Sequence, residues 1–448
     1  MLNDIVLIIK IEHCMLFLII KIYISAMNSV ILERNAKIGE AGKATRLRRK
    51  GQVCKVYKCK IDVSSLTSKQ REQLKMMFVE SKWIYNDIIR WSKEEGHTVF
   101  DYKLKSSVVR KDKDMNDVEQ ELTWTSSHVR QEILQQTKNQ VKTLSTLKRR
   151  GKKVGEMKFL SEYNTVNLKQ YNNTWKRSGD KHLHIQGVKG NVRVNGLKQI
   201  PSDVEYANAK ICSTPLGYYI AITTYTDTKK EEKKKDIVLG VDFGCSTSFT
   251  TSEGKKINSF VEESGRLKAL QRRIARQKKG SSRRRKNIYL LRREYQKMNN
   301  KKNDLANKIA HYLLSYKRVV IQDEQLQSWK TEHGTKVQHS VLGRVKSILQ
   351  RKDNVTILNK WLPTTRVCTQ CGTYHDDMTL KDRVFRCDCG IEEDRDIHAA
   401  KTMVWLYEHK IGLGQTEYKR TQIEEEIRRA TSSYRISKLL SECEGATL

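Results

Sequence analysis

Four cysteines in the C-terminal third of the chain have the spacing of a metal site. They are Cys368, Cys371, Cys387 and Cys389. A glycine follows each pair (Gly372 and Gly390), so the backbone can turn toward a bound ion. Four thiolates at this spacing close a tetrahedral Zn²⁺ site and leave no open position for a substrate. The sequence therefore predicts one structural Zn²⁺ in residues 366–391. The alternative is that His375 substitutes for one of the cysteines as a ligand, but we expect His375 to be a surface residue.

Three acidic residues stand where apolar segments end or where a helix begins. Asp242 and Glu324 follow apolar runs, and Asp396 lies in the sequence Asp394-Arg395-Asp396. Cleavage of a phosphodiester needs an activated water and a neutralised leaving oxygen. Two Mg²⁺ ions about 3.5–4 Å apart, held by carboxylates, supply both. A single Asp after a strand is more typical of a cap or a surface residue, so the prediction of a two-Mg²⁺ catalytic site rests on the three together.

The charge of the chain indicates a polyanionic partner. Lys and Arg number 86 against 51 Asp and Glu, a net charge of +35 over 448 residues. Nucleic acid is the usual partner of such a chain, and an anionic membrane surface is the alternative. Residues 1–27 contain no uncharged span of membrane length, and Asp4 precedes their basic residues. We interpret them as a dispensable extension, and we expect a cytoplasmic, nucleoid-associated protein with no membrane partner.

Two apolar strands with a helix between them would position the first two carboxylates. Ile237–Asp242 and Arg318–Ile321 read as buried strands, and Asn303–Tyr316 reads as a helix. This order predicts an α/β sheet whose functional edge lies at the carboxyl ends of its strands. Gly265–Met298 reads as one long basic helical region. The charged segment Lys229–Asp236 contains no apolar residue and marks the main domain boundary.

The N-terminal half reads as helices followed by short strands. Val53–Ile61 has the pattern of a strand, and a helix begins after Thr67, with Gln70 placed to complete a capping box. We expect mostly helix from there to about residue 160, and β-rich structure in residues 155–227. The first helix has a buried stripe that we interpret as core rather than as a binding surface. The stripe consists of Leu74, Met77, Phe78, Ser81, Ile84, Tyr85 and Ile88.

Two basic runs are candidates for contacts with phosphate groups. One lies within residues 148–153 and the other within residues 278–286. A solvated basic face is the alternative for each run. The candidate nucleic-acid-binding residues are Arg149, Arg150, Lys278, Lys279, Arg283, Arg284, Arg285 and Lys286.

As a set, these motifs resemble the TnpB (OrfB) proteins of bacterial insertion sequences, relatives of the type V CRISPR nucleases. The resemblance runs from about Lys55 to Lys419. It is carried by the stretch from Tyr57 to Asn86, by Gly240–Gly244, by the basic helical region, by the cysteine element, and by Gly414–Lys419. It implies a split RNase H-like (RuvC) nuclease domain with an inserted zinc ribbon. A helical recognition lobe and a small β-barrel-like wedge domain would precede that nuclease.

The resemblance carries catalytic roles onto individual residues. Asp242 matches the first catalytic position, and Asp396, rather than Asp394, matches the third. The second segment of most relatives reads Glu-Asp-Leu, whereas this chain reads Gln-Asp-Glu-Gln-Leu from residue 322. We assign Glu324 to the site with Asp323 as the alternative, and Gln322 at that position would leave the enzyme inactive. His398 replaces the usual Asn, a change expected to alter hydrogen bonds around the site without removing a ligand.

The resemblance and the composition shifts together predict six segments. They are an N-terminal extension (1–50), the wedge and helical recognition lobe (51–227), a first stretch of the nuclease core (236–365), the zinc ribbon (366–391), a second stretch of the nuclease core (392–420) and a loose tail (421–448).

The resemblance implies a DNA endonuclease of a mobile element that is directed by a guide RNA. Its partners would be that RNA and a double-stranded DNA target, held mainly through their backbones. The alternative is an RNA-guided DNA-binding protein, a repressor or a transposition accessory, whose catalytic site has degraded. The irregular segment from residue 322 to residue 325 is the feature that favours this alternative. The sequence does not indicate the oligomeric state.

Overall fold

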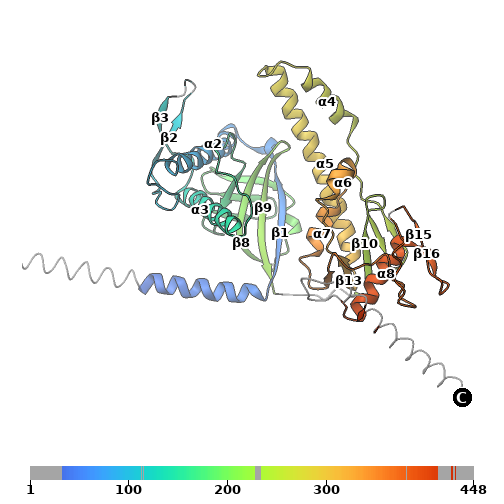
Figure 1. The fold of residues 1–448 in the computed structure, drawn as a ribbon. Coiled ribbons are helices and arrows are strands. Elements are labelled where there is room, and N and C mark those ends of the chain that lie inside the picture. The colour runs from blue at the N-terminus through green and yellow to red at the C-terminus, as the bar shows by residue number, and fades with distance from the viewer. Residues whose placement is uncertain are drawn as a thin grey trace, which may run out of the picture. The chain divides into compact units, whose positions relative to one another are not determined.

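The computed structural model describes residues 33–112, 114, 116–227, 234–379, 381–411, 425, 426 and 429. The chain divides into two compact units, Met1–Lys230 and Glu231–Leu448, which are described separately (Figure 1). The expected extension at residues 1–27, the motif at Gly414–Lys419 and most of the expected tail lie outside the described residues. No helix in the described part of the chain combines the length and apolar character needed to cross a membrane.

The N-terminal unit contains a seven-stranded antiparallel sheet in the order β4-β8-β9-β1-β7-β6-β5. Its strands are β1 (Val53–Ile61), β4 (Thr165–Leu168), β5 (Trp175–Ser178), β6 (His182–Ile185), β7 (Asn191–Asn195), β8 (Glu205–Thr214) and β9 (Gly217–Thr226). Both the first strand and the β-rich segment before residue 227 are therefore confirmed. Among the described strands, β4 and β5 do not pair, so hydrogen bonds do not close the sheet into a barrel.

Helix α2 (Ser68–Trp91) packs on this sheet with the buried stripe expected from the sequence. The Thr67 hydroxyl accepts from the Gln70 backbone N–H, and the Gln70 side chain accepts from the Thr67 N–H, so the predicted capping box is present. A second helix, α3 (Ser127–Arg149), follows. Residues 33–50 are also helical. The short 3₁₀ turns η1 (Val63–Ser65) and η2 (Leu197–Gln199) complete the unit.

The expectation of mostly helix up to residue 160 was wrong between α2 and α3. Strands β2 (Ser107–Lys111) and β3 (Asp117–Glu121) form an antiparallel hairpin there. Asp87 of α2 attaches this region, since it accepts from the Tyr102 hydroxyl at 2.6 Å and from the Val109 N–H at 3.3 Å. The fully buried Glu80 accepts from the backbone N–H groups of residues 123–125. Buried carboxylates of α2 thus attach this region by hydrogen bonds, in addition to the buried Val108 of β2.

The C-terminal unit is built on a five-stranded sheet in the order β12-β11-β10-β13-β14. Strand β10 (Lys235–Phe243) pairs in parallel with β13 (Tyr316–Gln322), and β13 pairs in parallel with β14 (Val355–Leu358). Strands β11 (Phe249–Thr251) and β12 (Lys256–Ile257) add an antiparallel edge. Both predicted apolar strands are confirmed. Parallel strands end at the same edge of a sheet, so the residues that follow β10, β13 and β14 share one edge.

Helices cover both faces of this sheet. Helices α5 (Ser282–Leu314) and α7 (Leu342–Leu349) pack on one face with Val319 and Ile321 of β13. Helix α8 (Arg395–Glu408) packs on the other face with Val320. The alternation along β13 explains why the strand reads as a continuous apolar run, because both of its faces are buried.

The basic helical region is divided differently from the expectation. Helix α4 (Gly265–Ala275) ends early, and α5 then runs without a break through the stretch expected to separate two helices. Gly280, with a positive φ of 84°, lies in the turn between them. Helix α4 and the start of α5 form a hairpin that extends away from the sheet (Figure 1). Helix α6 (Trp329–His339) and the small antiparallel pair β15 (Val384–Arg386) and β16 (Glu392–Asp394) complete the unit.

Candidate functional site

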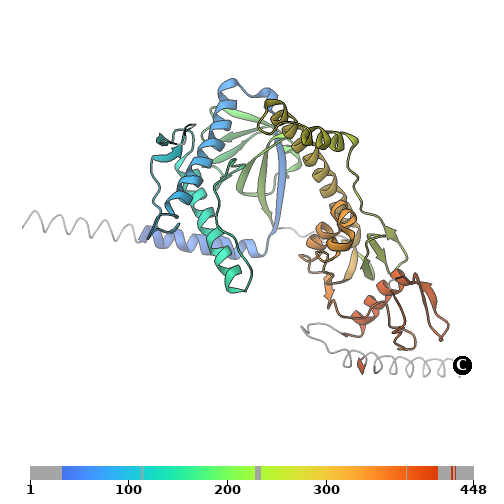
Figure 2. The same cartoon turned by 45° about the horizontal axis from the view of Figure 1, so that its top comes forward.

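A glycine inside strand β10 determines how closely helix α8 approaches the sheet. A Cβ atom at Gly240 would lie 1.9 Å from the carbonyl oxygen of Ala400, so no other residue fits there without displacing α8. Leu239, Val241 and Phe243 face α5 and α7. Gly240 and Asp242 alternate with them and therefore point to the α8 face. This close contact brings the start of α8 to the end of β10 (Figure 2).

The first turn of α8 carries the third carboxylate. Asp394 is the N-cap, and its side chain accepts from the backbone N–H groups of Asp396 (3.0 Å) and Ile397 (3.2 Å). Its other oxygen forms an ion pair with Lys256 at 2.6 Å. The Asp396 carboxylate accepts a hydrogen bond from the guanidinium of the neighbouring Arg395 at 3.1 Å. Asp394 is therefore occupied in holding the helix start, whereas Asp396 projects from the first turn with a half-buried carboxylate.

In the irregular segment at the end of β13, Gln322, Asp323 and Glu324 have three different roles. The Gln322 amide nitrogen donates to the carbonyl oxygens of Asn359 (3.1 Å) and Leu362 (2.8 Å), and its oxygen accepts from the Thr364 hydroxyl. Gln322 is thus buried in a structural contact with the turn after β14. Asp323 is exposed and paired with Lys346 at 2.7 Å.

Lys346 also donates to the backbone oxygen of Glu324 at 2.6 Å and so fixes the loop that carries this residue. The Glu324 side chain is half-buried. Burial raises its pKa, and the nearby Lys346 opposes that effect.

The charges of the other two carboxylates act on Asp242. Burial raises the pKa of Asp242 well above its usual range, and the negative charges of Asp396 and Glu324 raise it further, while Arg395 opposes them. The ligand oxygens of these three carboxylates do not all lie within 4.8 Å of one another. Among the described residues, only the four cysteines form a ligand group that compact. Carboxylates that repel one another in this way are suited to share hard cations.

The four cysteines meet in the C-terminal unit as the spacing predicts. Their sulfur atoms all lie within 4.8 Å of one another, with 3.5 Å between Cys368 and Cys389 and 3.3 Å between Cys371 and Cys387. A tetrahedral Zn²⁺ with Zn–S bonds of about 2.3 Å needs similar separations, so the donor set fits this ion. Burial opposes ionisation of Cys371, but the neighbouring Thr373 lowers the pKa of this thiol to about 7.

His398, which the sequence singles out only as a departure from its relatives, joins the cysteine element to α8. Its ring stacks on Phe385 of β15 at 3.6 Å between centroids. One ring nitrogen lies 2.8 Å from the Glu393 carboxylate, and the other lies 2.8 Å from the carbonyl oxygen of Val367. The side chain is buried, and burial lowers its pKa against the effect of Glu393.

His375 departs from the expected surface position. It is half-buried and packs edge-on against Phe385. It is not a member of the ligand group that the four cysteines form.

The candidate basic residues differ in what they contact. Arg149 and Arg150 end α3 and are exposed, as are Lys278, Lys279, Arg283, Arg285 and Lys286 around the α4–α5 turn. Arg284 is half-buried and donates to the carbonyl oxygens of Ile274 (2.6 Å) and Gln277 (3.0 Å). Its guanidinium therefore stabilises the turn, which the basic composition alone does not reveal.

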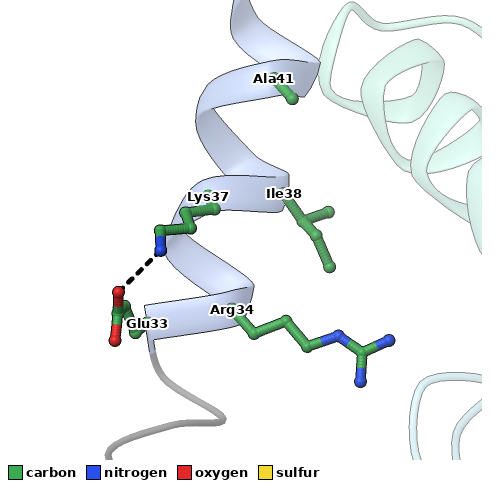
Figure 3. Close-up of a pocket in the computed structure, with 5 residues that line it drawn as sticks. All are labelled: Glu33, Arg34, Lys37, Ile38 and Ala41. Atoms are coloured by element: carbon green, nitrogen blue, oxygen red, sulfur yellow. Dashed lines mark hydrogen bonds and ion pairs between the residues drawn. The ribbon is translucent and has the colours of Figure 1, made fainter.

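A hollow beside the helix of residues 33–50 involves none of the candidate residues. The side chains that line it all come from this one helix, and Lys37 pairs with Glu33 at 2.7 Å (Figure 3). Ile38 in the hollow is exposed. This arrangement offers a solvated helix surface rather than a set of converging catalytic groups.

Two segments of the chain match known protein families. Residues 220–327, which include β10 and β13, match the family described as a probable transposase (OrfB_IS605). Residues 346–403, which include the four cysteines and the start of α8, match the Cas12f1-like TNB domain. Both matches support the TnpB/OrfB family for this chain. The two matched segments contain all three candidate carboxylates, so the resemblance inferred from the motifs is confirmed.

One relative and one solved structure are also similar to this chain. The relative is a Streptomyces pristinaespiralis protein with the provisional name RNA-guided DNA endonuclease, 24% identical over 242 residues. The match covers 52% of this chain and 60% of the relative, so the chain spans less than two thirds of the relative's length. The structure is a Cas12f1–sgRNA–target DNA complex, with 10% identity and a TM-score of 0.41 over 79% of this chain and 99% of that one. A likeness this weak supports no conclusion about function.

Proposed function

We propose that this OrfB-family chain is an RNA-guided DNA endonuclease of a mobile element. The observation that carries the proposal is the meeting of Asp242, Glu324 and Asp396 from three separate segments, close enough for their charges to raise the pKa of Asp242. The name of the Streptomyces pristinaespiralis relative supports guidance by RNA and DNA as the substrate.

The chain's own groups would divide the reaction between them. Asp242 and Asp396 would hold two Mg²⁺ ions at the carboxyl edge of the sheet, with Glu324 completing the site. When bound, these ions would supply an activated water and neutralise the leaving oxygen. Asp394 and Lys346 would be positioning residues, since Asp394 fixes the start of α8 and Lys346 fixes the Glu324 backbone. Arg395 would hold the Asp396 carboxylate in place.

The remaining regions of the chain would bind and position nucleic acid. We assign residues 51–227 to the wedge and recognition lobe, and residues 236–365 and 392–420 to the RuvC-like core. The cysteine element of residues 366–391 would hold one structural Zn²⁺. The exposed basic residues around the α4–α5 turn and at the end of α3 would contact phosphate groups of the guide RNA and its DNA target.

Single substitutions in the purified ribonucleoprotein test the catalytic assignment. The chain is co-expressed with its flanking element DNA, and the bound RNA is sequenced and used to design a matching plasmid. Asp242→Ala and Glu324→Ala should each abolish Mg²⁺-dependent cutting while target binding remains. Asp323→Ala is the matched control, because Asp323 is the adjacent carboxylate but is exposed and paired with Lys346, and it should retain cutting.

Other outcomes would change the proposal. Loss of cutting in Asp323→Ala but not in Glu324→Ala would exchange the two assignments. A wild-type complex that binds its target but never cuts would support the non-cutting alternative. Recovery of the protein without RNA would remove guidance altogether.

A further inference from the structure

An exposed tryptophan lies at the sheet edge that carries the candidate carboxylates. Strand β14 ends at Leu358, which pairs with Gln322 of the parallel strand β13. The turn that follows β14 therefore leaves the sheet at the same edge as the segment that carries Glu324. Trp361 occupies the middle of this turn.

The turn around Trp361 is held in place by hydrogen bonds from Gln322 and by the buried Leu362. Gln322 donates to two of its carbonyl oxygens, those of Asn359 and Leu362. The Leu362 side chain is buried in the core beneath α8. The Asn359 side chain in turn accepts from the Trp361 N–H at 3.0 Å. The backbone that presents Trp361 is thus fixed by hydrogen bonds and by an apolar anchor.

The Trp361 side chain nevertheless points into solvent. It is 67% exposed, the most exposed Phe, Tyr or Trp side chain among the described residues. The Lys360 ammonium lies 4.5 Å from its ring centre. A large aromatic side chain is normally buried, and a rigid turn that exposes one points to a ligand that covers it.

The surroundings of the ring favour a nucleobase over a protein surface. The apolar neighbours Leu358 and Leu362 are buried, whereas the polar Lys360 borders the ring. A protein interface would need a much larger contiguous apolar patch. A single flat ring next to a cation is the arrangement on which an unpaired base stacks while its phosphate meets the charge.

We propose that Trp361 is a stacking site for an unpaired nucleobase of the strand that enters the carboxylate edge, with Lys360 contacting a phosphate. The inference deepens the proposed nuclease function and rests on it for the identity of the strand. Stacking would hold the strand beside the carboxylates, so Trp361 is a positioning residue and takes no part in bond cleavage.

Photo-crosslinking tests the contact independently of cutting. The full-length ribonucleoprotein is irradiated with a single-stranded DNA that contains 5-iododeoxyuridine, and tryptic peptides are mapped. The expected crosslink lies in the peptide Trp361–Arg366, both in the wild type and in Asp242→Ala. Trp361→Ala should bind the strand about tenfold more weakly, the usual size of one base–aromatic stack. Trp361→Phe should retain most of the binding, because it preserves an aromatic face.

Ile357→Ala is the matched control, since Ile357 is an exposed apolar residue (40%) of β14, the strand that leads into the Trp361 turn, and it should bind as the wild type does. Bound zinc confirms that each variant is folded. A crosslink at Trp361 in a protein that does not cut would uphold the stacking site and overturn the nuclease. Normal cutting with no crosslink at Trp361, or with unchanged binding by Trp361→Ala, would overturn the stacking site.

Discussion

The cysteine site and the carboxylate site lie in the same unit but are assembled in different ways. The four sulfur atoms come from two short turns of one segment and meet within 4.8 Å. The three carboxylates come from the end of β10, from the loop after β13 and from the first turn of α8. Local turns alone can close the first site, whereas the second exists only when α8 packs on the sheet. A change that disturbs this packing should therefore damage the carboxylate site and leave the cysteine site intact.

The largest effect is expected from a methyl group at Gly240. Gly240→Ala would place a carbon 1.9 Å from the Ala400 carbonyl oxygen and displace α8 with Asp396. Cutting should fall at least a hundredfold, since misplacement by about 1 Å already costs that much. Bound zinc should stay at one equivalent. Gly343→Ala is the matched control, because a Cβ there meets nothing within 4 Å, and it should cut normally. Full activity of Gly240→Ala would show that α8 does not set the site.

Removal of zinc tests whether loss of the cysteine site also damages the carboxylate site. Cys387→Ser should lose the metal and loosen Phe385 and Val367, which hold His398 of α8. Cutting should fall about 10- to 100-fold, the usual cost of losing a supporting contact. Zinc content and cutting rate are measured on the same preparation. Cys212→Ser, at a half-buried thiol of the other unit, should change neither. Wild-type cutting by zinc-free protein would mean that the two sites are independent.

A smaller effect is expected from His398→Asn, which restores the residue common in relatives. The shorter side chain cannot reach both Glu393 and Val367 and also stack on Phe385. Stability should fall by about 1–3 kcal/mol, the cost of a buried polar group left unpaired. Thermal melting of the purified protein gives the value. His184→Asn, at an exposed strand position, should melt as the wild type does. An unchanged melting temperature for His398→Asn would show that the contacts of His398 between the cysteine element and α8 do not stabilise the protein.

The smallest effects should come from the exposed basic residues around the α4–α5 turn. Lys279→Ala should weaken nucleic-acid binding only a few-fold and reduce the salt dependence of binding by about one phosphate contact. Arg284→Ala should instead loosen the turn, because Arg284 contacts backbone carbonyls. Titrations at several salt concentrations distinguish the two variants. An identical salt slope for wild type and Lys279→Ala would place Lys279 on a solvated face.

The sequence predicts elements best where burial leaves a simple apolar pattern. The strands of residues 237–242 and 318–321 were found as continuous apolar runs, because these strands are buried. The stripe of α2 was found because burial of one helix face imposes a period on its apolar residues. The β2–β3 hairpin was missed because its strands are short and mostly polar, and carboxylates of α2 hold it. The continuity of α5 was missed because its polar middle resembles a linker.

Site prediction failed where a residue acts through tertiary contacts. The cysteine spacing carries its own geometry, so the sequence alone located that site. Gly240 left a readable signal, a glycine inside a buried strand, which marks close approach of another backbone. The structural contacts of Gln322 and the buried position of His398 left none, because each depends on partners far along the chain.

The position of α8 on the sheet also has a consequence for biosynthesis. Ribosomes release the chain from its N-terminus, so β10, β13 and β14 emerge before the helix that covers them. Until residues 395–408 have emerged, Val320, Leu358 and Leu362 lack their apolar cover. A nascent chain at this stage exposes these apolar side chains, and it has not yet received the third carboxylate. The order of translation thus completes the carboxylate site only when the sheet can be covered.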